Sequence, residues 1–349
     1  HCALSIEKAL NRDGVVGKKI SYEKARGQIT FDQEKVRKDE LIQAIDNLAH
    51  YKVVAVEEVD QNNSSDSQKH LVIIGGGSAA FAAAIRANEL GARVTMINGG
   101  DLPVGGTCVN VGCVPSKTLI RAAEVLHKAN HNPFSGIYTE GKLIDFKEVI
   151  HQKRELVGEL QKEKYINVIK DMNNFEYIDG WARFLDEFTV EVNGRKIKGD
   201  YFLIATGAKP IIPDIPSLSE VDYLTNISAF ELEQVPEKLI VLGGNYIGLE
   251  IAQIFNRFGS NVTVVEIMPH ILPSEDTGVV REIQHHLEKE GIQFVTHAET
   301  SRLEKTEDGI RLFIRKKDEE FILEGSHVLV ATGRKANTEG MGLEDIGIK

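Results

Sequence analysis

The spacing of hydrophobic positions predicts a small mixed unit over roughly the first 60 residues. Residues 5–10 and 38–48 place apolar side chains at helical spacing, whereas residues 15–22, 25–31 and 51–56 have the character of strands. The predicted order is helix, strand, strand, helix, strand, which is a split βαβ arrangement lacking its first strand. We therefore expect a small ferredoxin-like α+β domain over residues 1–60, truncated at its start.

A polar stretch separates this unit from the rest of the chain. Residues 60–69 contain no apolar side chain and are dense in Asn, Asp and Ser, a composition typical of flexible linkers. The sequence thus predicts a linker over residues 61–69 and a tethered first domain.

From His70 onward the pattern repeats itself. Two units of strand, glycine turn, helix and strand begin their glycine clusters at Gly75 and Gly243, and both halves close with Ala-Thr-Gly, at 205–207 and 331–333. A buried strand running through a glycine turn into a helix is typical of a dinucleotide-binding fold. The predicted fold class is α/β, with two Rossmann-like domains at 70–215 and 216–335 and a return of 336–349 to the first of them.

Composition and charge exclude several other classes of protein. The chain has 349 residues, is 42% hydrophobic and 27% charged, and carries a formal net charge of -11, so it lacks the basic character that a nucleic-acid partner requires. No apolar run approaches the ~18 residues of a membrane span, and no signal peptide is recognisable at the start. Three cysteines are too few for a disulfide framework and suit a reducing compartment, so we expect a cytoplasmic protein. Because the chain starts with His1-Cys2 and stops at Lys349, we expect both ends to be truncated.

The first glycine turn has the pattern G-x-G-x-x-A. Gly75 permits the tight turn, Gly77 lets the backbone approach a pyrophosphate, and Ala80 lets helix and strand pack closely. The strand after the helix ends at Asn98, where an acidic residue would normally hold ribose hydroxyls. An amide can still bind them, without the assistance of a charge.

The second turn runs from Gly243 to Gly248 and has Asn245 in place of the middle glycine. We expect Asn245 to crowd the approach of a pyrophosphate without forbidding it. Glu266 ends the next strand, can accept from ribose hydroxyls and would repel a 2′-phosphate, which favours NADH over NADPH.

Cys108 and Cys113 are the strongest chemical signal in the chain. They lie five residues apart at the start of a predicted helix and are flanked by glycines, so we predict a disulfide that opens and closes, with thiolate pKa values lowered by the helix dipole. Lys117 follows one helical turn later and can present a cation to a flavin or a thiolate.

Together, residues 105–117 and the two predicted Rossmann units closely resemble the flavin disulfide reductases, the class I pyridine nucleotide-disulfide oxidoreductases. Within that family, residues 77–85, Val109, Val114 and residues 132–134 are most similar to the mercuric reductases. The start of the chain resembles a heavy-metal-associated domain just after the first cysteine of its Cys-x-x-Cys loop, which makes Cys2 a candidate metal ligand.

The resemblance implies FAD as cofactor, NADPH or NADH as reductant and Hg(II) as substrate, bound by Cys108 and Cys113 and reduced to Hg(0). It implies that Cys113 lies nearest the flavin and Cys108 exchanges ligands, that Lys117 pairs with Glu250, and that Tyr246 covers the flavin where nicotinamide docks. The expected cofactor-binding residues are Gly75, Gly77, Ser78, Ala79, Ala80, Asn98, Gly100, Gly106, Thr107, Lys117, Thr206, Gly207, Ala208, Gly243, Asn245, Tyr246, Gly248, Glu266 and Gly333.

The resemblance also implies a homodimer of the full-length protein and a C-terminal interface domain, which the sequence up to Lys349 does not contain. Members of the mercuric reductase group usually favour NADPH, in conflict with the preference that Glu266 indicates. Two other functions stay open: a dihydrolipoamide dehydrogenase-like disulfide oxidoreductase, and a metal-binding protein without catalytic turnover.

Overall fold

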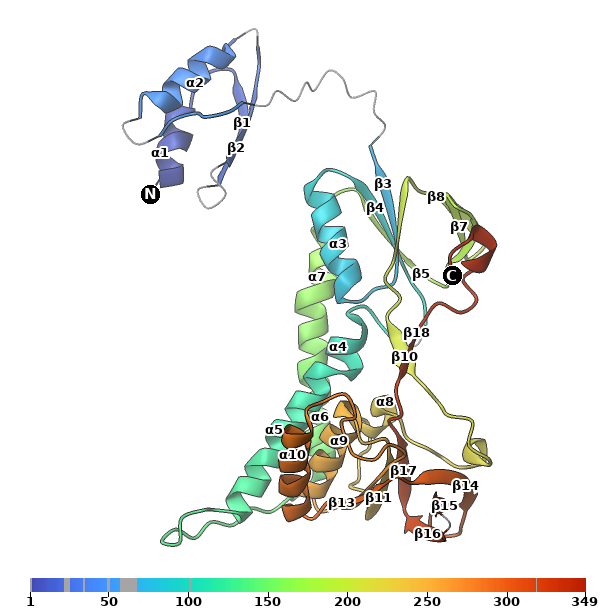
Figure 1. Cartoon of the computed structure of the whole chain (residues 1–349). Helices are drawn as coiled ribbons and strands as arrows, with labels where there is room; N and C mark the ends of the chain where they lie inside the picture. The colour runs from blue at the N-terminus through green and yellow to red at the C-terminus, as the bar shows by residue number, and fades with distance from the viewer. Residues whose placement is uncertain are drawn as a thin grey trace. The chain divides into compact units, whose positions relative to one another are not determined.

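The computed structural model describes residues 2–21, 26–33, 35–48, 51–56, 68–100, 102–317 and 319–349. The chain divides into two compact units, His1–Ser67 and Gln68–Lys349, which are treated separately below (Figure 1). Most of the predicted linker, 61–69, and the side chain of Cys2 lie outside the described residues.

The first unit contains two helices and an antiparallel pair of strands. In chain order the elements are α1 (Cys2–Ala9), β1 (Val15–Ser21), β2 (Arg26–Phe31) and α2 (Lys38–Asp46). Leu10, Val36 and Leu41 form its buried core. These four elements agree with the sequence pattern to within a few residues.

The strand predicted for residues 51–56 is wrong. The backbone N–H of Val53 donates to the side chain of Asp46, at 2.7 Å, so that no neighbouring strand takes this hydrogen bond. Val54 is 95% exposed, which shows that the apolar residues of this segment do not pack into the core of the unit.

The second unit opens with a four-stranded parallel sheet. Its strands are β3 (His70–Ile74), β4 (Arg93–Asn98), β5 (Phe175–Asp179) and β9 (Tyr201–Ile204), in the order β5-β4-β3-β9. Helix α3 (Ser78–Glu89) connects β3 to β4. Val72, Ile73 and Met96 are fully buried, as expected for a parallel sheet covered on both faces.

A second parallel sheet repeats this plan. Its strands are β11 (Lys238–Leu242), β12 (Asn261–Glu266), β13 (Gln293–Thr296) and β17 (His327–Val330), in the order β13-β12-β11-β17. Helix α9 (Tyr246–Arg257) takes the place of α3, and α10 (Thr277–Lys289) connects β12 to β13. The two parallel sheets and their glycine turns are those of a pair of Rossmann-like halves.

Each half also carries a three-stranded antiparallel sheet between its third and fourth parallel strands. These sheets consist of β6 (Arg183–Asp186), β7 (Thr189–Val192) and β8 (Arg195–Lys198) in the first half, and β14 (Glu299–Lys305), β15 (Ile310–Lys316) and β16 (Glu319–Gly325) in the second. The internal repeat therefore extends beyond the glycine turns to the whole connectivity.

The halves are joined by a short two-stranded ladder. Strand β10 (Ala208–Pro210) leaves the first half and pairs antiparallel with β18 (Arg334–Ala336), which returns from the second (Figure 1). Beyond β18, Met341 and Leu343 are buried in the core of the first half, and a 3-10 turn, η4 (Glu344–Ile346), follows.

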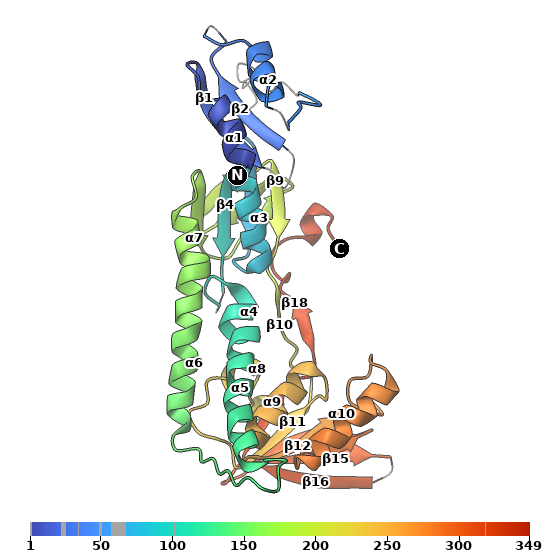
Figure 2. The same cartoon turned by 90° about the vertical axis from the view of Figure 1, so that its left-hand side faces the viewer.

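Helices of the first half extend to the second half, as Figure 2 shows. They are α4 (Gly106–Val111), α5 (Cys113–Asn130), α6 (Phe146–Gln161), the π-helical turn η2 (Lys162–Ile166) and α7 (Asn167–Lys170). The short turns η3 (Leu218–Glu220) and α8 (Asn226–Ala229) precede the second half.

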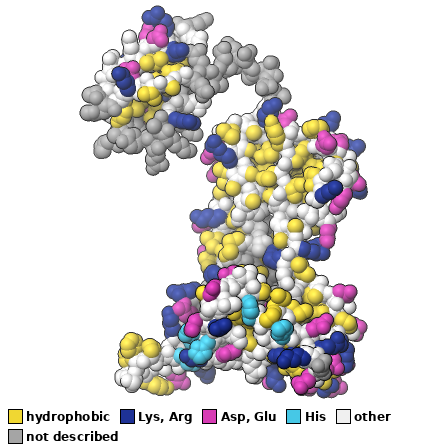
Figure 3. All heavy atoms as spheres, in the orientation of Figure 1, with side chains coloured by type: hydrophobic (Ala, Val, Ile, Leu, Met, Phe, Trp, Pro, Cys, Tyr) yellow, Lys and Arg dark blue, Asp and Glu magenta, His cyan; other side chains and the backbone are white. Residues whose placement is uncertain are grey.

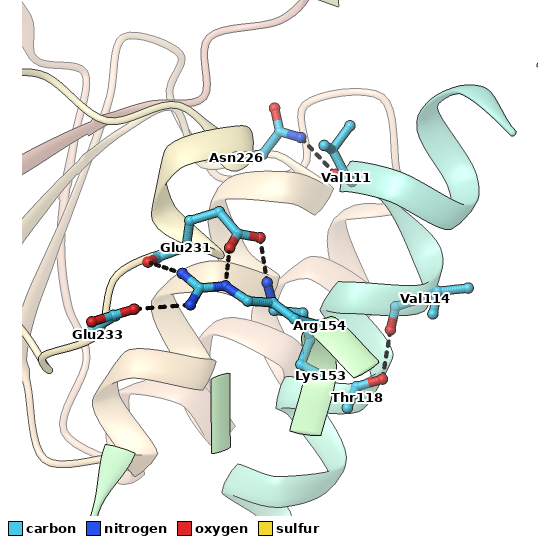
Figure 4. A network of polar contacts seen from close by, with 8 residues as sticks. All are labelled: Val111, Val114, Thr118, Lys153, Arg154, Asn226, Glu231 and Glu233. Atoms are coloured by element: carbon cyan, nitrogen blue, oxygen red, sulfur yellow. Dashed lines mark hydrogen bonds and ion pairs between the residues drawn. The ribbon is translucent and has the colours of Figure 1, made fainter. Parts of the chain in front are cut away.

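A polar network fastens α6 to the segment after α8 (Figure 4). Lys153 is only 1% exposed and pairs with Glu231, while Arg154 binds both Glu231 and Glu233. Burial lowers the pKa of Lys153. Only Lys153 is buried, since Glu231 is 45% and Arg154 41% exposed. Loss of Glu231 would leave the buried Lys153 charge without its partner, so this network contributes to holding α6 against the second half.

Acidic and basic side chains are interspersed on the face of the molecule shown in Figure 3. Among the described residues, no helix combines the length and the apolar character needed to cross a membrane.

Candidate functional site

The first glycine turn lies between β3 and α3. Gly75 has φ +123°, and a Cβ there would lie 2.1 Å from the carbonyl oxygen of Ala205, so only glycine fits. Gly77 begins α3 without a side-chain cap. Ser78 and Ala79 are exposed on the first turn of the helix, and Ala80 is fully buried. The positive end of the helix dipole is therefore open to an anion at this turn.

A second glycine pair packs directly on this turn. The N–H of Gly105 donates to the carbonyl oxygen of Gly76 at 2.7 Å, and a Cβ on Gly106 would lie 2.6 Å from the Cα of Gly77. Gly106 is followed at once by Thr107 and Cys108. The first glycine turn and the segment that carries the cysteines thus lie in direct contact.

Cys108 lies on α4, and Cys113 is the first residue of α5. Both are exposed free thiols. Gly112 separates the two helices, and a Cβ there would lie 2.8 Å from the carbonyl oxygen of Thr107, so a glycine is needed for the chain to bring the two cysteines together.

The expected lowering of thiolate pKa values is wrong for Cys108. Its pKa is raised, first by a hydrogen bond with Cys113 and then by burial and the neighbouring charge. The main cause is thus the contact between the two thiols themselves.

Lys117 and Glu250 form the ion pair that the resemblance implies, with Nζ and Oε1 2.5 Å apart. The pair joins α5 of the first half to α9 of the second. Because the side chains are 57% and 39% exposed, the pair adds at most about 1 kcal/mol to stability. Its effect is to hold the Lys117 cation one helical turn from Cys113.

The second glycine turn has the same backbone plan as the first but different side-chain chemistry. A Cβ on Gly243 would lie 2.5 Å from the carbonyl oxygen of Ala331, and one on Gly248 would lie 2.1 Å from that of Gly243. Asn245 has an ordinary extended backbone (φ -100°), and its side chain accepts a hydrogen bond from the N–H of Tyr246. The residue that we expected to crowd the approach of a pyrophosphate therefore also caps α9.

Tyr246 is the first residue of α9 and is 54% exposed. Its hydroxyl donates to the carboxylate of Glu275, which raises the pKa of Tyr246. The sequence did not predict this hydrogen bond, which ties the phenol of Tyr246 to Glu275.

Glu266 and Asn98 occupy equivalent positions at the ends of β12 and β4. Glu266 is 7% exposed, and its carboxylate accepts from the N–H groups of Gly244, at 2.6 Å, and Met268, at 2.8 Å. Asn98 donates to the carbonyl oxygen of Leu102 at 3.3 Å. A carboxylate has about four acceptor positions, so Glu266 can still accept from a ribose while it braces the turn.

The remaining predicted residues lie where β9 and β17 end and at the end of β4. Gly100, Gly207 and Gly333 all have positive φ, at +107°, +69° and +145°. The carbonyl oxygen of Thr206 accepts from the side chain of Asn337, and Ala208 begins β10.

Sequence reasoning missed Arg334. Its guanidinium donates to the carbonyl oxygen of Ala208 and approaches the Thr107 hydroxyl at 3.5 Å, and burial lowers its pKa. The sequence repeat contained a signal for this residue. The Ala-Thr-Gly that closes each half is followed by Ala208 in the first half but by a charged residue, Arg334, in the second.

The described residues contain no cluster of three or more His, Cys, Asp or Glu side chains suited to a resident metal ion. The two thiols lie on the segment that packs against the first glycine turn, and α5, which begins at Cys113, is linked to α9 of the second half through Lys117 and Glu250. A dithiol next to two dinucleotide-type halves is typical of one class of oxidoreductases.

Comparison with known proteins leads to the same class. Residues 69–349 match the family described as pyridine nucleotide-disulphide oxidoreductase. A mercuric reductase from Lysinibacillus sphaericus is 39% identical over 100% of this chain and 64% of its own length. A dihydrolipoyl dehydrogenase from Geobacillus stearothermophilus is 37% identical over 77% of this chain and 57% of its own. The solved Cu(II) complex of the HOCl-induced flavoprotein disulfide reductase RclA from Escherichia coli is 30% identical, with a TM-score of 0.70 over 81% of this chain and 60% of its own.

The chain belongs to the pyridine nucleotide-disulphide oxidoreductase family. It spans less than two thirds of the length of these relatives.

Family membership implies FAD as cofactor and NAD(P)H as reductant, and the residues of the first turn fit FAD. The helix N-terminus at Gly77 has no side-chain cap. A Cβ on Gly77 would meet nothing closer than the Cα of Gly106, at 3.6 Å, so the space beside Gly77 is open for a pyrophosphate to approach its backbone. The thiols of Cys108 and Cys113 follow on the same continuous stretch of chain.

Proposed function

We propose that this chain is the nucleotide-binding and dithiol part of a mercury(II) reductase, which uses NAD(P)H and FAD to convert Hg(II) to Hg(0). The observation that carries the proposal is the pair of exposed thiols on a glycine-rich segment packed against the first glycine turn. Soft thiolates are the ligands that a soft metal ion prefers. The similarity of the whole chain to a mercuric reductase supports Hg(II) as the substrate.

The overall reaction consumes one NAD(P)H and one Hg(II) and yields NAD(P)⁺, H⁺ and Hg(0). Bound FAD supplies the two-electron connection between the nicotinamide and the dithiol. Gly77 and the start of α3 would hold its pyrophosphate, while Lys117, fixed by Glu250, would present a positive charge to the flavin and to the Cys113 thiolate.

The two cysteines have different tasks in this proposal. The hydrogen bond with Cys113 raises the pKa of Cys108, and Hg(II) would displace the proton of this thiol when it binds. Both sulfurs then bind Hg(II), with Cys113 on the flavin side and Cys108 as the outer ligand. Tyr246, with its hydroxyl held by Glu275, would cover the place where nicotinamide docks.

A dithiol reductase of the lipoamide type is the second candidate, supported by the similarity to a dihydrolipoyl dehydrogenase. It uses the same thiols and nucleotide turns but a disulfide substrate. A metal-binding protein without turnover is the third.

The experiment that separates these functions is NAD(P)H oxidation by the FAD-loaded full-length protein, with Hg(II) or oxidised lipoamide as acceptor. We expect Hg(II)-dependent oxidation, abolished by Cys108→Ala and by Cys113→Ala, and release of volatile mercury. Lipoamide-dependent oxidation alone would favour the second function. Bound FAD with no oxidation by either acceptor would favour the third.

For the parts of the molecule around this centre, the proposal includes a ferredoxin-like, heavy-metal-associated first domain in which Cys2 contributes to metal binding. It also includes a homodimer of the full-length protein and a cytoplasmic location. The role of Cys2 can be tested by measuring Hg(II) binding to a Cys2→Ser variant. The homodimer can be tested by measuring the mass of the full-length protein in solution.

A further inference from the structure

Trp181 is the only tryptophan in the sequence, and its side chain is 71% exposed. It lies directly beyond Gly180, where the chain leaves the carboxyl end of β5. Single exposed apolar residues are common on protein surfaces, so its exposure alone indicates nothing. Its position relative to the first glycine turn is what gives it meaning.

The indole lies against the backbone that follows β4. The N–H of Gly180 donates to the carbonyl oxygen of Asn98 at 3.0 Å. A Cβ on Gly99 would lie 2.4 Å from the carbonyl oxygen of Gly180, and a Cβ on Gly100 would lie 3.2 Å and 3.3 Å from Cζ2 and Cη2 of Trp181. Two glycines therefore allow the ring to lie close to the end of β4, while most of the Trp181 side chain stays exposed.

The strand order indicates what this ring meets. Ligands of a doubly wound sheet bind beyond the carboxyl ends of its strands. In the order β5-β4-β3, the pyrophosphate belongs at the end of β3 and the ribose at the end of β4, beside Asn98. The base attached to that ribose then extends toward the end of β5, where Trp181 is exposed.

We propose that Trp181 stacks on the adenine of FAD and so contributes to retention of the cofactor. This inference rests on the proposed binding of FAD to the first half. Stacking of a base on an aromatic side chain increases affinity about tenfold or more. It would add to a site whose ribose contact, Asn98, carries no charge.

The first test is a change in FAD affinity. With apoprotein refolded or stripped of flavin, Trp181→Ala should bind FAD about 10-fold more weakly than the wild type, whereas Trp181→Phe, which keeps an aromatic face, should stay within about 3-fold. Phe188→Ala is the matched control, since Phe188 is a 60% exposed aromatic residue on the turn between β6 and β7 of the same half. Its FAD affinity should not change.

The second test reports contact directly. ADP contains the adenine and pyrophosphate but no flavin, so it cannot accept energy from an excited indole. Titration of the apoprotein with ADP should quench the emission that the wild type shows and Trp181→Phe lacks, and inorganic pyrophosphate should leave that emission unchanged.

The outcomes separate this inference from the proposed function. Wild-type affinity in Trp181→Ala, or ADP binding without a change in emission, would overturn the stacking role while leaving FAD binding intact. A wild-type protein that binds no FAD would remove the proposed function and this inference together.

Discussion

The two glycine turns have the same backbone plan but differ in the side-chain hydrogen bonds that their backbone N–H groups make. In the second turn the chain's own side chains do so, because Asn245 accepts from the N–H of Tyr246 and Glu266 accepts from that of Gly244. In the first turn Gly77 has no side chain to cap α3, and Asn98 donates elsewhere. Both turns pack on the same carbonyl of the closing Ala-Thr-Gly, so the backbone has been kept while the polar chemistry has diverged.

This difference teaches how one fold can serve both a permanent and an exchanging ligand. A phosphate that binds the first turn does not have to displace a side-chain hydrogen bond, whereas one that binds the second turn competes with Asn245 and Glu266 for the same amides. This difference fits the proposal that the first turn holds FAD firmly and the second binds a nicotinamide nucleotide that must leave after every turnover.

Alanine at the first glycine of each turn should give the largest effect. Gly75→Ala and Gly243→Ala both introduce a Cβ into a carbonyl oxygen at a positive φ, so each should cost roughly 3 kcal/mol of stability. Gly75→Ala should yield protein without FAD, measured by the flavin-to-protein absorbance ratio. Gly243→Ala should keep FAD but raise the KM for NAD(P)H about 10-fold or more.

Gly91→Ala and Gly259→Ala are the matched controls, because both positions have positive φ but no atom within 4 Å of the added Cβ. They should lose about 1–2 kcal/mol of stability and keep both ligands. Retention of FAD by Gly75→Ala would contradict the assignment of the first turn.

The connection between the halves is tested by Lys117→Met. In Lys117→Met we expect kcat to fall about 100-fold, as for the loss of a positioned electrostatic group. In Glu250→Gln we expect kcat to fall about 10-fold. Because the pair is exposed, the free energy of unfolding should change by less than about 1 kcal/mol. Arg86→Gln, which breaks the exposed Arg86 to Glu89 pair on α3, is the control for loss of an ion pair alone. If the free energy of unfolding fell by as much as the activation free energy rose, the role of Lys117 would be structural only.

Glu266→Gln tests the difference between the residues that end β4 and β12. It places an uncharged amide at the end of β12, as Asn98 does at the end of β4. Removing the charge should raise the ratio of kcat/KM for NADPH to that for NADH by about 10-fold, while the amide oxygen can still accept from Gly244. Glu288→Gln, on the exposed side of α10, should leave the ratio unchanged. An unchanged ratio in Glu266→Gln would exclude Glu266 as the determinant.

The smallest effect is expected from Asn245→Gly, which restores the middle glycine of the pattern. The N–H of Tyr246 loses its side-chain partner, so the KM for NAD(P)H should fall about 2-fold and stability should fall by a few tenths of a kcal/mol. A rise in KM would show that the capped turn binds the nucleotide better than an open one.

Local patterns predicted much of this structure because they depend on short stretches of chain. The two turns, their helices and the parallel strands follow from glycine spacing and apolar runs, and residues 105–117 were sufficient to find the dithiol segment. The Lys117 to Glu250 pair was predicted only through resemblance, since its partners lie on different halves.

The remaining features depend on three-dimensional contacts that no local pattern encodes. The raised pKa of Cys108 comes from the geometry of one thiol against another, and the strand expected at 51–56 failed because Asp46 takes the N–H of Val53. Trp181 and Arg334 gain their meaning from neighbours that are distant in sequence. Periodicity cannot show such neighbours.

The ladder of β10 and β18, and the burial of Met341 and Leu343 beyond it, have a consequence for how the protein is made. The second half, from Lys238 to Val330, is one continuous stretch and can fold as soon as it leaves the ribosome. The first half is synthesised earlier, but part of its core arrives only with residues 341–343. The half that emerges first is thus the last to be completed, and until then its unfilled core needs protection from aggregation.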